Sequence, residues 1–402
     1  MKRLYIWGAG NYLKLVYQTI NKDLCMVQGI VDKDKSKQGK IWENHILIES
    51  PEILMKINFD YVLISVKNYE EIVKECLNMG VNKDQIIVFW EPDGNMPYID
   101  KRKGIYELER EIKKYKCRLE NLPYELGLGN IPKINSSVHL LKRVIQDKVS
   151  VCRFGDGELE LMRGNERPWF QSMNKKLSVR LKDIFYSRES NIIIALANNF
   201  GNLDCYTDDA ADEIREYLYG NTRKEIMKYI DMKYIYYDAY VSRPYILYKD
   251  KNRAKIIFDL YKQIWNYRNV LIVEGKYART GIGNDLFLGT GEVKRIICPG
   301  MNAFQKYEEI LNAIYKNIAK DDLVLISLGP TATVLAYDLA KNGIQAFDIG
   351  QLDNEYHWFL SKAEKKIEIP GKSVAEVEGC HCPKDLVADK KYEKQIVEQI
   401  TD

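Results

Sequence analysis

The chain has 402 residues, of which 46% are hydrophobic and 29% are charged. This length exceeds the roughly 250–300 residues at which one hydrophobic core stops growing, so two domains are expected. The 60 Lys and Arg residues against 57 Asp and Glu leave a net charge of +3, which is too balanced for a protein that holds nucleic acid by neutralising its phosphates.

No apolar run approaches the ~20 residues that cross a bilayer, so a membrane-spanning protein is not expected. The first residues enter a strand pattern without an apolar leader core, and we therefore expect a cytoplasmic protein. Eight scattered cysteines are expected to be reduced and mostly buried. Cys380-His381-Cys382 has no second pair at the spacing of a zinc site, and the four histidines form no cluster, so metal binding there is not favoured.

Residues 1–98 are predicted to form a first α/β domain. A short strand runs into Gly8-Ala9-Gly10, a helix follows, and a second strand ends on Asp32. In a dinucleotide-binding domain the glycines approach the pyrophosphate, and an acidic residue about 20 positions later meets the ribose. Leu13 stands in place of the third glycine of that pattern. Gly8, Gly10 and Asp32 therefore indicate either a weak nucleotide site or the plain tight turn of a Rossmann-like scaffold.

Residues 99–135 are predicted to be a helical linker, which Pro123 is expected to interrupt. The apolar residues of this helix recur at alternating spacings of three and four and form one stripe on an otherwise charged surface, over Ile105, Leu108, Ile112, Tyr115, Leu119 and Leu122. Such a stripe either pairs with a twin helix in a homo-oligomer or packs on a neighbouring domain. Fewer than three heptads favour the packing interpretation.

Residues 136–390 are predicted to form the second domain, in which a strand over Ser150–Phe154 ends at Gly155-Asp156-Gly157-Glu158. The glycines permit tight backbone geometry, and alternate carboxylates on a turn can present oxygens to one hard cation that bridges a diphosphate. Mn²⁺ or Mg²⁺ at Asp156 and Glu158 would neutralise the charge on a leaving nucleoside diphosphate. The alternative is an ordinary helix N-terminus with favourable carboxylates.

Polar residues follow several later strands of this domain. Open α/β sheets bind ligands outside the carboxyl ends of their strands, so these residues are candidates for substrate contact. The turn from Gly329 to Thr331 opens a helix, and its amides form either a phosphate cradle or a plain connection. The candidates at these strand ends are Arg243, Glu274, Arg279, Asn284, Asp285, Gly329, Pro330, Thr331, Asp348 and Asp353.

Five segments of the second domain together resemble the bacterial glycosyltransferases of the GT-D fold: Arg153–Glu158, Ser242–Tyr245, Gly283–Phe287, Gly329–Ala332 and Asp348–Gly350. The resemblance implies a Rossmann-like α/β catalytic domain and a DxE metal motif at Asp156 and Glu158. It also implies UDP-glucose or a similar UDP-sugar as donor and a glycan on a bacterial surface glycoprotein as acceptor. Gln351 departs from the family pattern, which has histidine there, so acceptor recognition is expected to differ.

The first domain lies outside this match, but Trp7–Asn11 and Ile30–Asp34 resemble the small Rossmann-like domains attached to bacterial surface-polysaccharide enzymes. The sequence therefore predicts an α/β protein of two Rossmann-like domains, the C-terminal one of GT-D glycosyltransferase type. The predicted function is metal-dependent transfer of a hexose in surface-glycan biosynthesis. The alternative is an NAD-linked enzyme or nucleotide-sensing module that binds through Gly8, Gly10 and Asp32.

We assign working roles to the candidate residues as a hypothesis. Asp156 and Glu158 hold the cation, and Asn284 with the Gly329–Thr331 turn positions the donor. One or more of Arg153, Arg243 and Arg279 neutralises phosphate. If the reaction inverts the anomeric centre, a general base must take the acceptor proton, and either Glu274 or Asp285 would serve.

Overall fold

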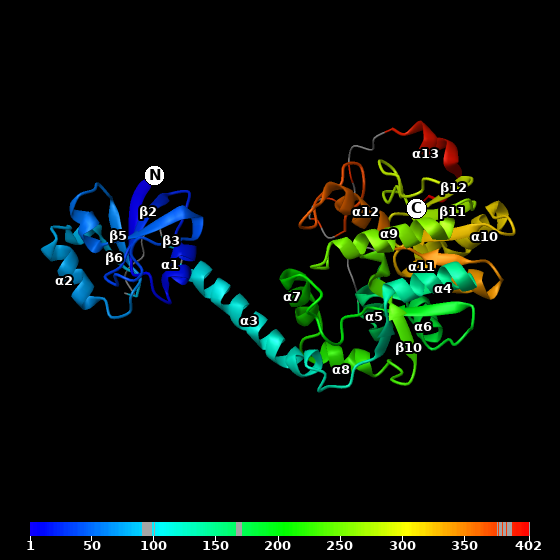
Figure 1. Cartoon of the computed structure of the whole chain (residues 1–402), viewed down its shortest axis with the longest axis horizontal. Helices are drawn as coiled ribbons and strands as arrows, with labels where there is room; N and C mark the ends of the chain where they lie inside the picture. Colours follow the sequence, from blue (N-terminus) through cyan, green and yellow to red (C-terminus); the bar gives the residue numbers. More distant parts are fainter. Residues whose placement is uncertain are drawn as a thin grey trace. The chain divides into compact units, whose positions relative to one another are not determined.

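The computed structural model describes residues 1–90, 99, 101–165, 171–375, 377, 380, 383 and 388–401. The chain divides into two compact units, Met1–Lys116 and Cys117–Asp402 (Figure 1). His381 and Cys382 lie outside the described residues, as does the side chain of Ile105. None of the helices in the described ranges combines the length and the apolarity that crossing a lipid bilayer would require.

The first unit is built on a six-stranded sheet with the strand order β3-β4-β2-β1-β5-β6. All its pairings are parallel except that of β3 with β4. Alternate residues of β1 enter different cores, because Leu4 and Ile6 face one side of the sheet while Tyr5 and Trp7 face the other. Its elements are β1 (Lys2–Trp7), α1 (Leu13–Thr19), β2 (Cys25–Val31), β3 (Ile41–Trp42), β4 (Ile46–Glu49), β5 (Tyr61–Ile64), α2 (Glu70–Asn78) and β6 (Ile86–Val88).

The second unit is built on a nine-stranded parallel sheet with the order β15-β12-β11-β13-β14-β8-β9-β10-β7. Its strands are β7 (Lys133–Asn135), β8 (Ser150–Phe154), β9 (Ile192–Leu196), β10 (Ile235–Asp238), β11 (Val270–Gly275), β12 (Val293–Cys298), β13 (Leu323–Ser327), β14 (Ala346–Asp348) and β15 (Ile396–Gln399). Both α/β units agree with the predicted fold class.

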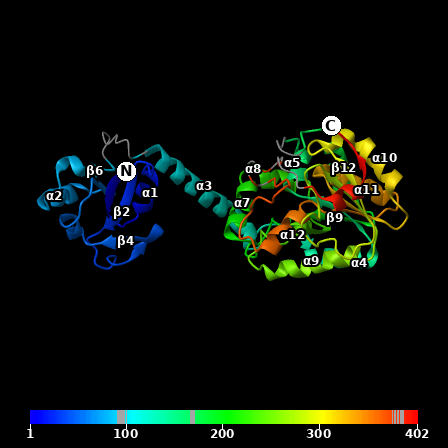
Figure 2. The same cartoon turned by 90° about the horizontal axis from the view of Figure 1, so that it is seen from above.

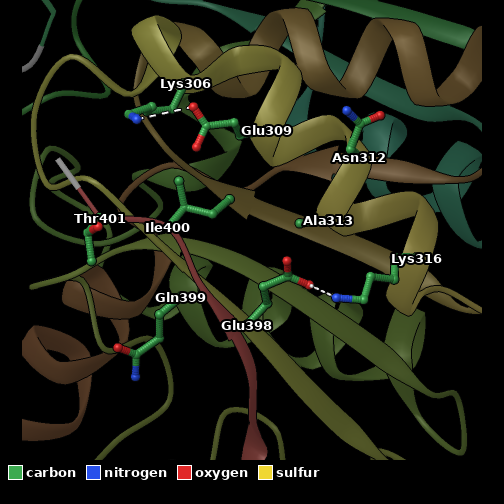
Figure 3. A pocket seen from close by; sticks show the side chains of 9 residues that line it. All are labelled: Lys306, Glu309, Asn312, Ala313, Lys316, Glu398, Gln399, Ile400 and Thr401. Carbon is green, nitrogen blue, oxygen red and sulfur yellow. Dashed lines mark hydrogen bonds and ion pairs between the residues drawn. The ribbon is translucent and has the colours of Figure 1, made fainter.

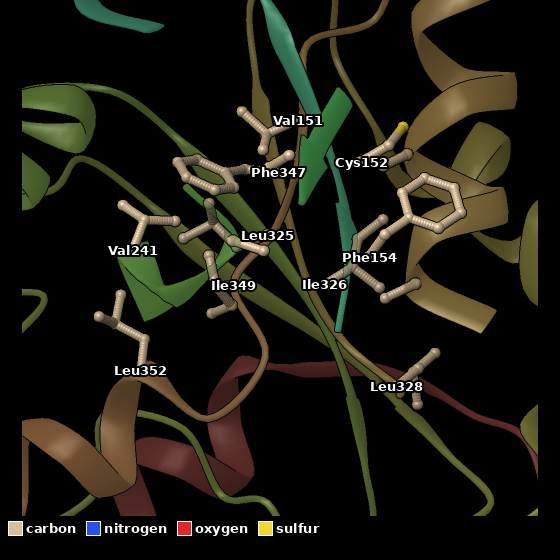
Figure 4. Packing of buried hydrophobic residues seen from close by; sticks show 14 of the residues in the cluster. Val151, Cys152, Phe154, Val241, Leu325, Ile326, Leu328, Phe347, Ile349 and Leu352 are labelled. Carbon is tan, nitrogen blue, oxygen red and sulfur yellow. The ribbon is translucent and has the colours of Figure 1, made fainter. Parts of the chain in front are cut away.

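Helices cover both faces of the nine-stranded sheet. The pair α4 and α9 packs together along one side, and α5, α6 and α11 pack together along the other (Figure 2). Figure 4 shows the hydrophobic core between β8, β13 and β14, where Val151, Leu325 and Phe347 meet. The helices are α4 (Ser137–Asp147), α5 (Asp156–Arg163), α6 (Lys175–Phe185), α7 (Asp208–Tyr217), α8 (Asn221–Met227), α9 (Asn252–Trp265), α10 (Tyr307–Asn317), α11 (Pro330–Lys341), α12 (Leu352–Ser361) and α13 (Lys390–Gln395).

The helix α3 (Lys101–Glu125) carries the chain from the first unit into the second. Pro123 lies inside its last turn and does not stop it, because a proline close to the end of a helix removes little of the hydrogen-bond ladder. The nine-stranded sheet begins with β7, inside the segment predicted as linker, and its last strand β15 lies beyond residue 390. The sheet is therefore longer at both ends of the sequence than predicted.

The C-terminal part of α3 is seated on the second unit through a buried polar contact. The Arg223 guanidinium donates to the Asn121 side chain at 2.6 Å and to the Phe200 carbonyl at 2.8 Å, and it stacks over the Tyr124 ring at 4.0 Å. Arg223 is 5% exposed and Asn121 is 1% exposed. A buried cation needs such partners, so this contact fixes the helix in place.

Arg223→Ala should lower the free energy of unfolding by about 3 kcal/mol, since it leaves the Asn121 and Phe200 oxygens buried without their donor. Urea denaturation of the whole chain measures this loss. The control Lys255→Ala removes an exposed ion pair with Asp259 and should cost less than about 0.5 kcal/mol. Equal losses in the two variants would show that the Arg223 contact does not stabilise the fold.

Candidate functional site

The carboxyl ends of the central strands β8 and β14 are joined by one guanidinium. Arg153, near the end of β8, donates to the Asp348 carbonyl at 2.8 Å and to the Asp348 carboxylate at 2.7 Å. It also donates to the Ser242 hydroxyl at 2.8 Å, in the turn that follows β10. Asp348 is 1% exposed, so its charge depends on this pair. Burial raises the pKa of Asp348, and Arg153 opposes that shift.

The backbone around Gly350 closes over this ion pair. Gly350 has a φ of +50°, and a Cβ built on it would lie 2.2 Å from Nη2 of Arg153. Its N–H donates to the Asp348 carboxylate at 3.1 Å, while its carbonyl accepts from the Ser327 hydroxyl at 2.8 Å. Only glycine fits both the left-handed conformation and the close approach of the guanidinium.

Asp156 and Glu158 lie in the first turn of α5, directly after β8. The Glu158 carboxylate accepts the Gly155 N–H at 2.9 Å, and the Asp156 carboxylate accepts the Gly157 N–H at 3.0 Å. These bonds use the N–H groups at the start of a helix, where negative charge is favoured. Both carboxylates therefore stand at the carboxyl end of β8, and Glu158 lies close to Arg153 and Asp348.

The pKa of Glu158 responds to its burial and to the carboxylate next to it. Burial and, after it, the nearby Asp348 carboxylate raise the pKa of Glu158 from 4.5 to about 7, although Arg153 acts in the opposite direction. Asp156 lies near enough to Tyr240 to help raise the pKa of that phenol, which burial raises first. Glu158 and Asp348 thus lie close enough to repel each other, and a cation placed beside them would relieve this repulsion.

Two other candidates, Glu274 and Arg279, are buried and contact other side chains of the protein. Glu274, at the end of β11, is fully buried and accepts from the Arg295 guanidinium at 2.7 Å and from the Thr280 N–H at 2.6 Å. Arg279 is 6% exposed, and its guanidinium lies 5.3 Å from the centre of the Tyr392 ring. The structure therefore places Glu274 and Arg279 inside the protein, where the Arg295 guanidinium and the Thr280 N–H hold the Glu274 carboxylate.

Asp285 stands apart from Glu274 at the surface. It is 52% exposed and forms an ion pair with Lys262 at 2.9 Å, and it accepts from the Tyr356 hydroxyl at 2.7 Å. The bonds from Tyr356 and Lys262 lower the pKa of Asp285. Of the two candidate bases, Asp285 is the one that solvent reaches.

Asn284 and Asp353 form a cluster that ties a loop to α12. Asp353 is 4% exposed; it accepts from the Asn284 amide at 2.7 Å and from the Gly281 N–H at 2.8 Å, and it is also bonded to the buried Lys372. The Asn284 amide lies 2.9 Å from Nε2 of His357. Asn284 and Asp353 are thus brought together, and they hold the 281–284 loop against the helix.

The turn from Gly329 to Thr331 opens α11 as predicted, with Gly329 at a φ of +54° and Pro330 at the first helical position. Thr331 is fully buried, and its hydroxyl has no hydrogen-bond partner within the described ranges. Arg243 is half-buried after the turn that ends β10 and lies near Tyr240. These residues flank the same carboxyl edge as Asp156.

In the first unit, Asp32 is turned toward the glycine loop. Its carboxylate accepts the Ala9 N–H at 2.7 Å and the Asp34 N–H at 2.9 Å, and it pairs with Lys37 at 3.1 Å. Gly8 has a φ of +116° and lies against Ser65. Gly8, Gly10 and Asp32 are therefore close together, and the Asp32 carboxylate braces the turn that a nucleotide would have to approach.

Several polar residues at the carboxyl edge of the second sheet were not among the predicted site residues. Ser242 and Thr333 hold the Arg153 pair from either side, since the Thr333 hydroxyl donates to the Arg153 carbonyl at 2.9 Å. Asn199, at 2% exposure, donates to the Tyr240 hydroxyl at 3.2 Å, and its side-chain oxygen has no hydrogen-bond partner in the described part of the chain. Their common signal was a small polar residue just past an apolar strand.

One hollow of the second unit lies away from all these candidates. It has a volume of about 440 Å³ between α10 and β15. Figure 3 shows that its walls carry the ion pairs Lys306–Glu309 and Lys316–Glu398. No candidate residue lines it. The candidates lie instead after the strands of the sheet.

Gly350→Ala should lower the free energy of unfolding by about 3 kcal/mol, because the added methyl displaces Arg153 and also strains a positive φ. Gly343→Ala is the matched control, since Gly343 has a φ of +76° with open space around its Cβ. It should cost about 1 kcal/mol. If urea denaturation gave the same loss for both variants, the guanidinium contact would not contribute.

Glu158 should make the fold less stable as the pH rises. Its raised pKa means that the folded protein binds more protons than the unfolded chain between pH 4.5 and about 7, so the free energy of unfolding falls through this range. Glu158→Gln should flatten the fall, whereas the exposed control Glu308→Gln should leave it unchanged. Parallel wild-type and Glu158→Gln profiles from pH 4.5 to 7.5 would contradict this assignment.

Comparison with known proteins agrees with this architecture. The family described as "Glycosyltransferase GT-D fold" matches residues 151–377, and the family "C2185-like, N-terminal" matches residues 1–87. A solved structure described as "The highly conserved domain of unknown function 1792 has a distinct glycosyltransferase fold" is 35% identical, with a TM-score of 0.63. The similarity covers 73% of this chain and 100% of that one. "A New Glycosyltransferase (DUF1792) from Streptococcus sanguinis" is 34% identical with a TM-score of 0.62, over 67% of this chain and 100% of that one.

Two curated relatives are longer proteins. "Probable glycosyl transferase Gly" of Streptococcus gordonii is 38% identical over 263 residues, which make up 64% of this chain and 37% of that protein. "Glycosyltransferase GlyD" of Streptococcus pneumoniae serotype 4 is 35% identical over 262 residues, 65% of this chain and 31% of that protein. The chain thus spans about a third of the length of these relatives. The match over residues 151–377 confirms the resemblance in the motifs, and the chain belongs to the glycosyltransferase family of the GT-D fold.

Proposed function

We propose that this chain transfers a hexose, with glucose as the first candidate, from a UDP-sugar to a glycan or glycoprotein acceptor in surface-glycan biosynthesis. The observation that carries the proposal is the pair of carboxylates, Asp156 and Glu158, in the first turn after the central strand β8. They stand at the edge where open α/β sheets bind ligands, in a chain of the GT-D family. We place the reaction in the cytoplasm.

A divalent cation, Mn²⁺ or Mg²⁺, suits the donor atoms at this edge. Asp156 and Glu158 offer hard carboxylate oxygens, and the raised pKa of Glu158 reports negative charge that burial leaves poorly compensated. The described residues hold no cluster of three or more His, Cys, Asp or Glu side chains arranged for a metal. Two carboxylates are enough for an ion that also binds substrate phosphates and water. When bound, the cation would neutralise charge on the leaving diphosphate.

Buried oxygens without partners support a ligand at the same edge. The Thr331 hydroxyl, the Asn199 side-chain oxygen and the Gln351 side-chain oxygen lack hydrogen-bond partners within the described ranges. Buried polar atoms are normally paired, and a bound substrate would supply the missing bonds. Gln351 occupies the position where the family pattern has histidine, so we propose that it contacts the acceptor.

The arginines divide into two groups in this proposal. Arg153 is engaged with Asp348 and Ser242, and it therefore positions the edge of the sheet more than it contacts phosphate. Arg243 is half-buried beside Tyr240, the phenol near Asp156, and it is our first candidate for a phosphate contact. For an inverting reaction we propose Asp285 as the base, because Glu274 is buried in its pair with Arg295.

UDP release from a panel of UDP-sugars, with and without Mn²⁺ and with candidate glycan acceptors, tests the proposal. Asp156→Asn and Glu158→Gln should each reduce metal-dependent release by at least about a hundredfold, since each removes a charge that binds the cation. Asp259→Asn, an exposed carboxylate on α9, should keep full activity.

Release that does not depend on metal, or that survives both substitutions, would remove the proposed role of the two carboxylates. A chain inactive with every UDP-sugar but able to bind NAD in a titration would favour the alternative of an NAD-linked or nucleotide-sensing module. The bracing of the glycine turn by Asp32 gives that alternative less support.

A further inference from the structure

The helix α3 has two different faces. Cys117 and Asn121 are buried on the face that is seated on the second unit. The opposite face carries large apolar side chains that solvent reaches, with exposed fractions from 45% to 70%, at Leu108, Ile112, Tyr115, Leu119 and Leu122. The residues of the predicted stripe are therefore exposed, whereas Cys117 and Asn121 are buried on a different face of the helix.

These five residues form one continuous stripe, because their spacings alternate between four and three. Single exposed apolar side chains are common on protein surfaces. A continuous stripe of five along one helix, in contrast, marks an interaction surface. The stripe has the a and d pattern by which helices pair side by side. From Leu108 to Leu122 it runs about 21 Å along the helix.

The charges that flank the stripe are arranged so that they complement themselves. The positions beside the apolar seam carry Glu109 and Glu111 in the first half of the helix, and Lys116 and Arg118 in the second half. Two copies running in opposite directions bring the flanking acids of one copy against the flanking bases of the other. Glu109 then faces Lys116 of the partner subunit, and Glu111 faces Arg118 of the partner subunit.

A parallel pair satisfies fewer of these charges. In that arrangement Glu111 meets Lys116 of the partner subunit, but Glu109 meets the partner's Gly104 and Arg118 meets the partner's Pro123. The antiparallel pair also keeps the apolar layers complete, with Leu108 against Leu119 of the partner subunit and Ile112 against Tyr115 of the partner subunit. Flanking acids in one half of the helix and flanking bases in the other complement themselves across a two-fold axis.

We propose that the chain forms a homodimer in which α3 of each copy pairs with α3 of the other, antiparallel, through this stripe. The dimer is independent of the sugar-transfer site and of the proposed function. Because the seam is shorter than three heptads, its affinity is modest, with a dissociation constant on the order of micromolar.

Sedimentation of the full chain over a range of concentrations tests the dimer directly. Leu119→Glu should raise the dissociation constant by more than about a hundredfold, because it places a charge in the centre of the seam. The control Leu126→Glu changes an exposed leucine just beyond the helix and should leave the dimer intact. Far-ultraviolet circular dichroism checks that each variant is folded. A wild-type chain that stays monomeric to about 100 μM would overturn the proposal.

A charge exchange tests the relative direction of the two helices. It leaves Arg118 unchanged, because Arg118 also bonds Asp212 of its own chain. Glu109→Lys should weaken an antiparallel dimer by about fivefold, since it faces Lys116 of the partner subunit. Adding Lys116→Glu to that variant should restore the wild-type constant. A parallel dimer predicts the reverse. Glu109→Lys alone would change its dissociation constant little, whereas Lys116→Glu would place an acid opposite Glu111 of the partner subunit. That second pattern would overturn the antiparallel arrangement.

Discussion

The ion pair between Arg153 and Asp348 is the interaction on which the candidate site depends. The strands that carry it are neighbours in the middle of the nine-stranded sheet, yet they come from segments 195 residues apart. β14 is three residues long and pairs with β8 at Phe347 and Val151, so backbone bonds alone hold these strand ends weakly. The guanidinium adds three bonds, which reach Asp348 and the Ser242 turn. A buried carboxylate without that partner would be strongly destabilising, and this dependence keeps the edge of the sheet in one arrangement.

The helix α12 organises the loops around this edge. Asp353 binds the 281–284 loop, Asn354 donates to the Ser373 carbonyl, and Tyr356 bonds Asp285. Glu355 is fully buried and accepts the N–H groups of Tyr245 and Ile246 at 2.9 Å each. Four consecutive side chains of one helix thus fix loops from three separate parts of the sequence. Such a support lets a polar surface keep a defined geometry before a substrate arrives.

The fold could be predicted because several strands, such as β1, β2 and β8, are short apolar runs followed directly by glycine or an acidic residue. That pattern located the Asp156–Glu158 turn and the glycine turn of the first unit, both of which follow a strand in the structure. Periodicity also located α3, and a local rule about Pro123 gave the wrong end for it. These successes rest on local sequence, where backbone preference and side-chain alternation act over a few residues.

The pairing of charges could not be predicted in the same way. Glu274 and Asp285 both follow strands and both looked available as bases, but Glu274 meets Arg295 inside the protein while Asp285 reaches solvent. Asn284 and Asp353 lie 69 residues apart and become partners only in the folded chain. A single sequence contains no record of which distant residues meet, so it can nominate polar residues at strand ends but cannot separate structural pairs from substrate contacts.

The strand β15 gives the second unit an unusual dependence on its last residues. Ile396–Gln399 forms the outer strand of the nine-stranded sheet, next to β12, and Arg295 reaches across to the Gln395 side chain at 2.8 Å. A fragment cut at residue 390 would contain every candidate residue of the transfer site but would leave the backbone of β12 as a bare edge. Long unpaired edges recruit strands from other molecules, whereas short edge strands do so less readily. The final strand therefore keeps the six-residue β12 inside the sheet and leaves the four-residue β15 as the edge.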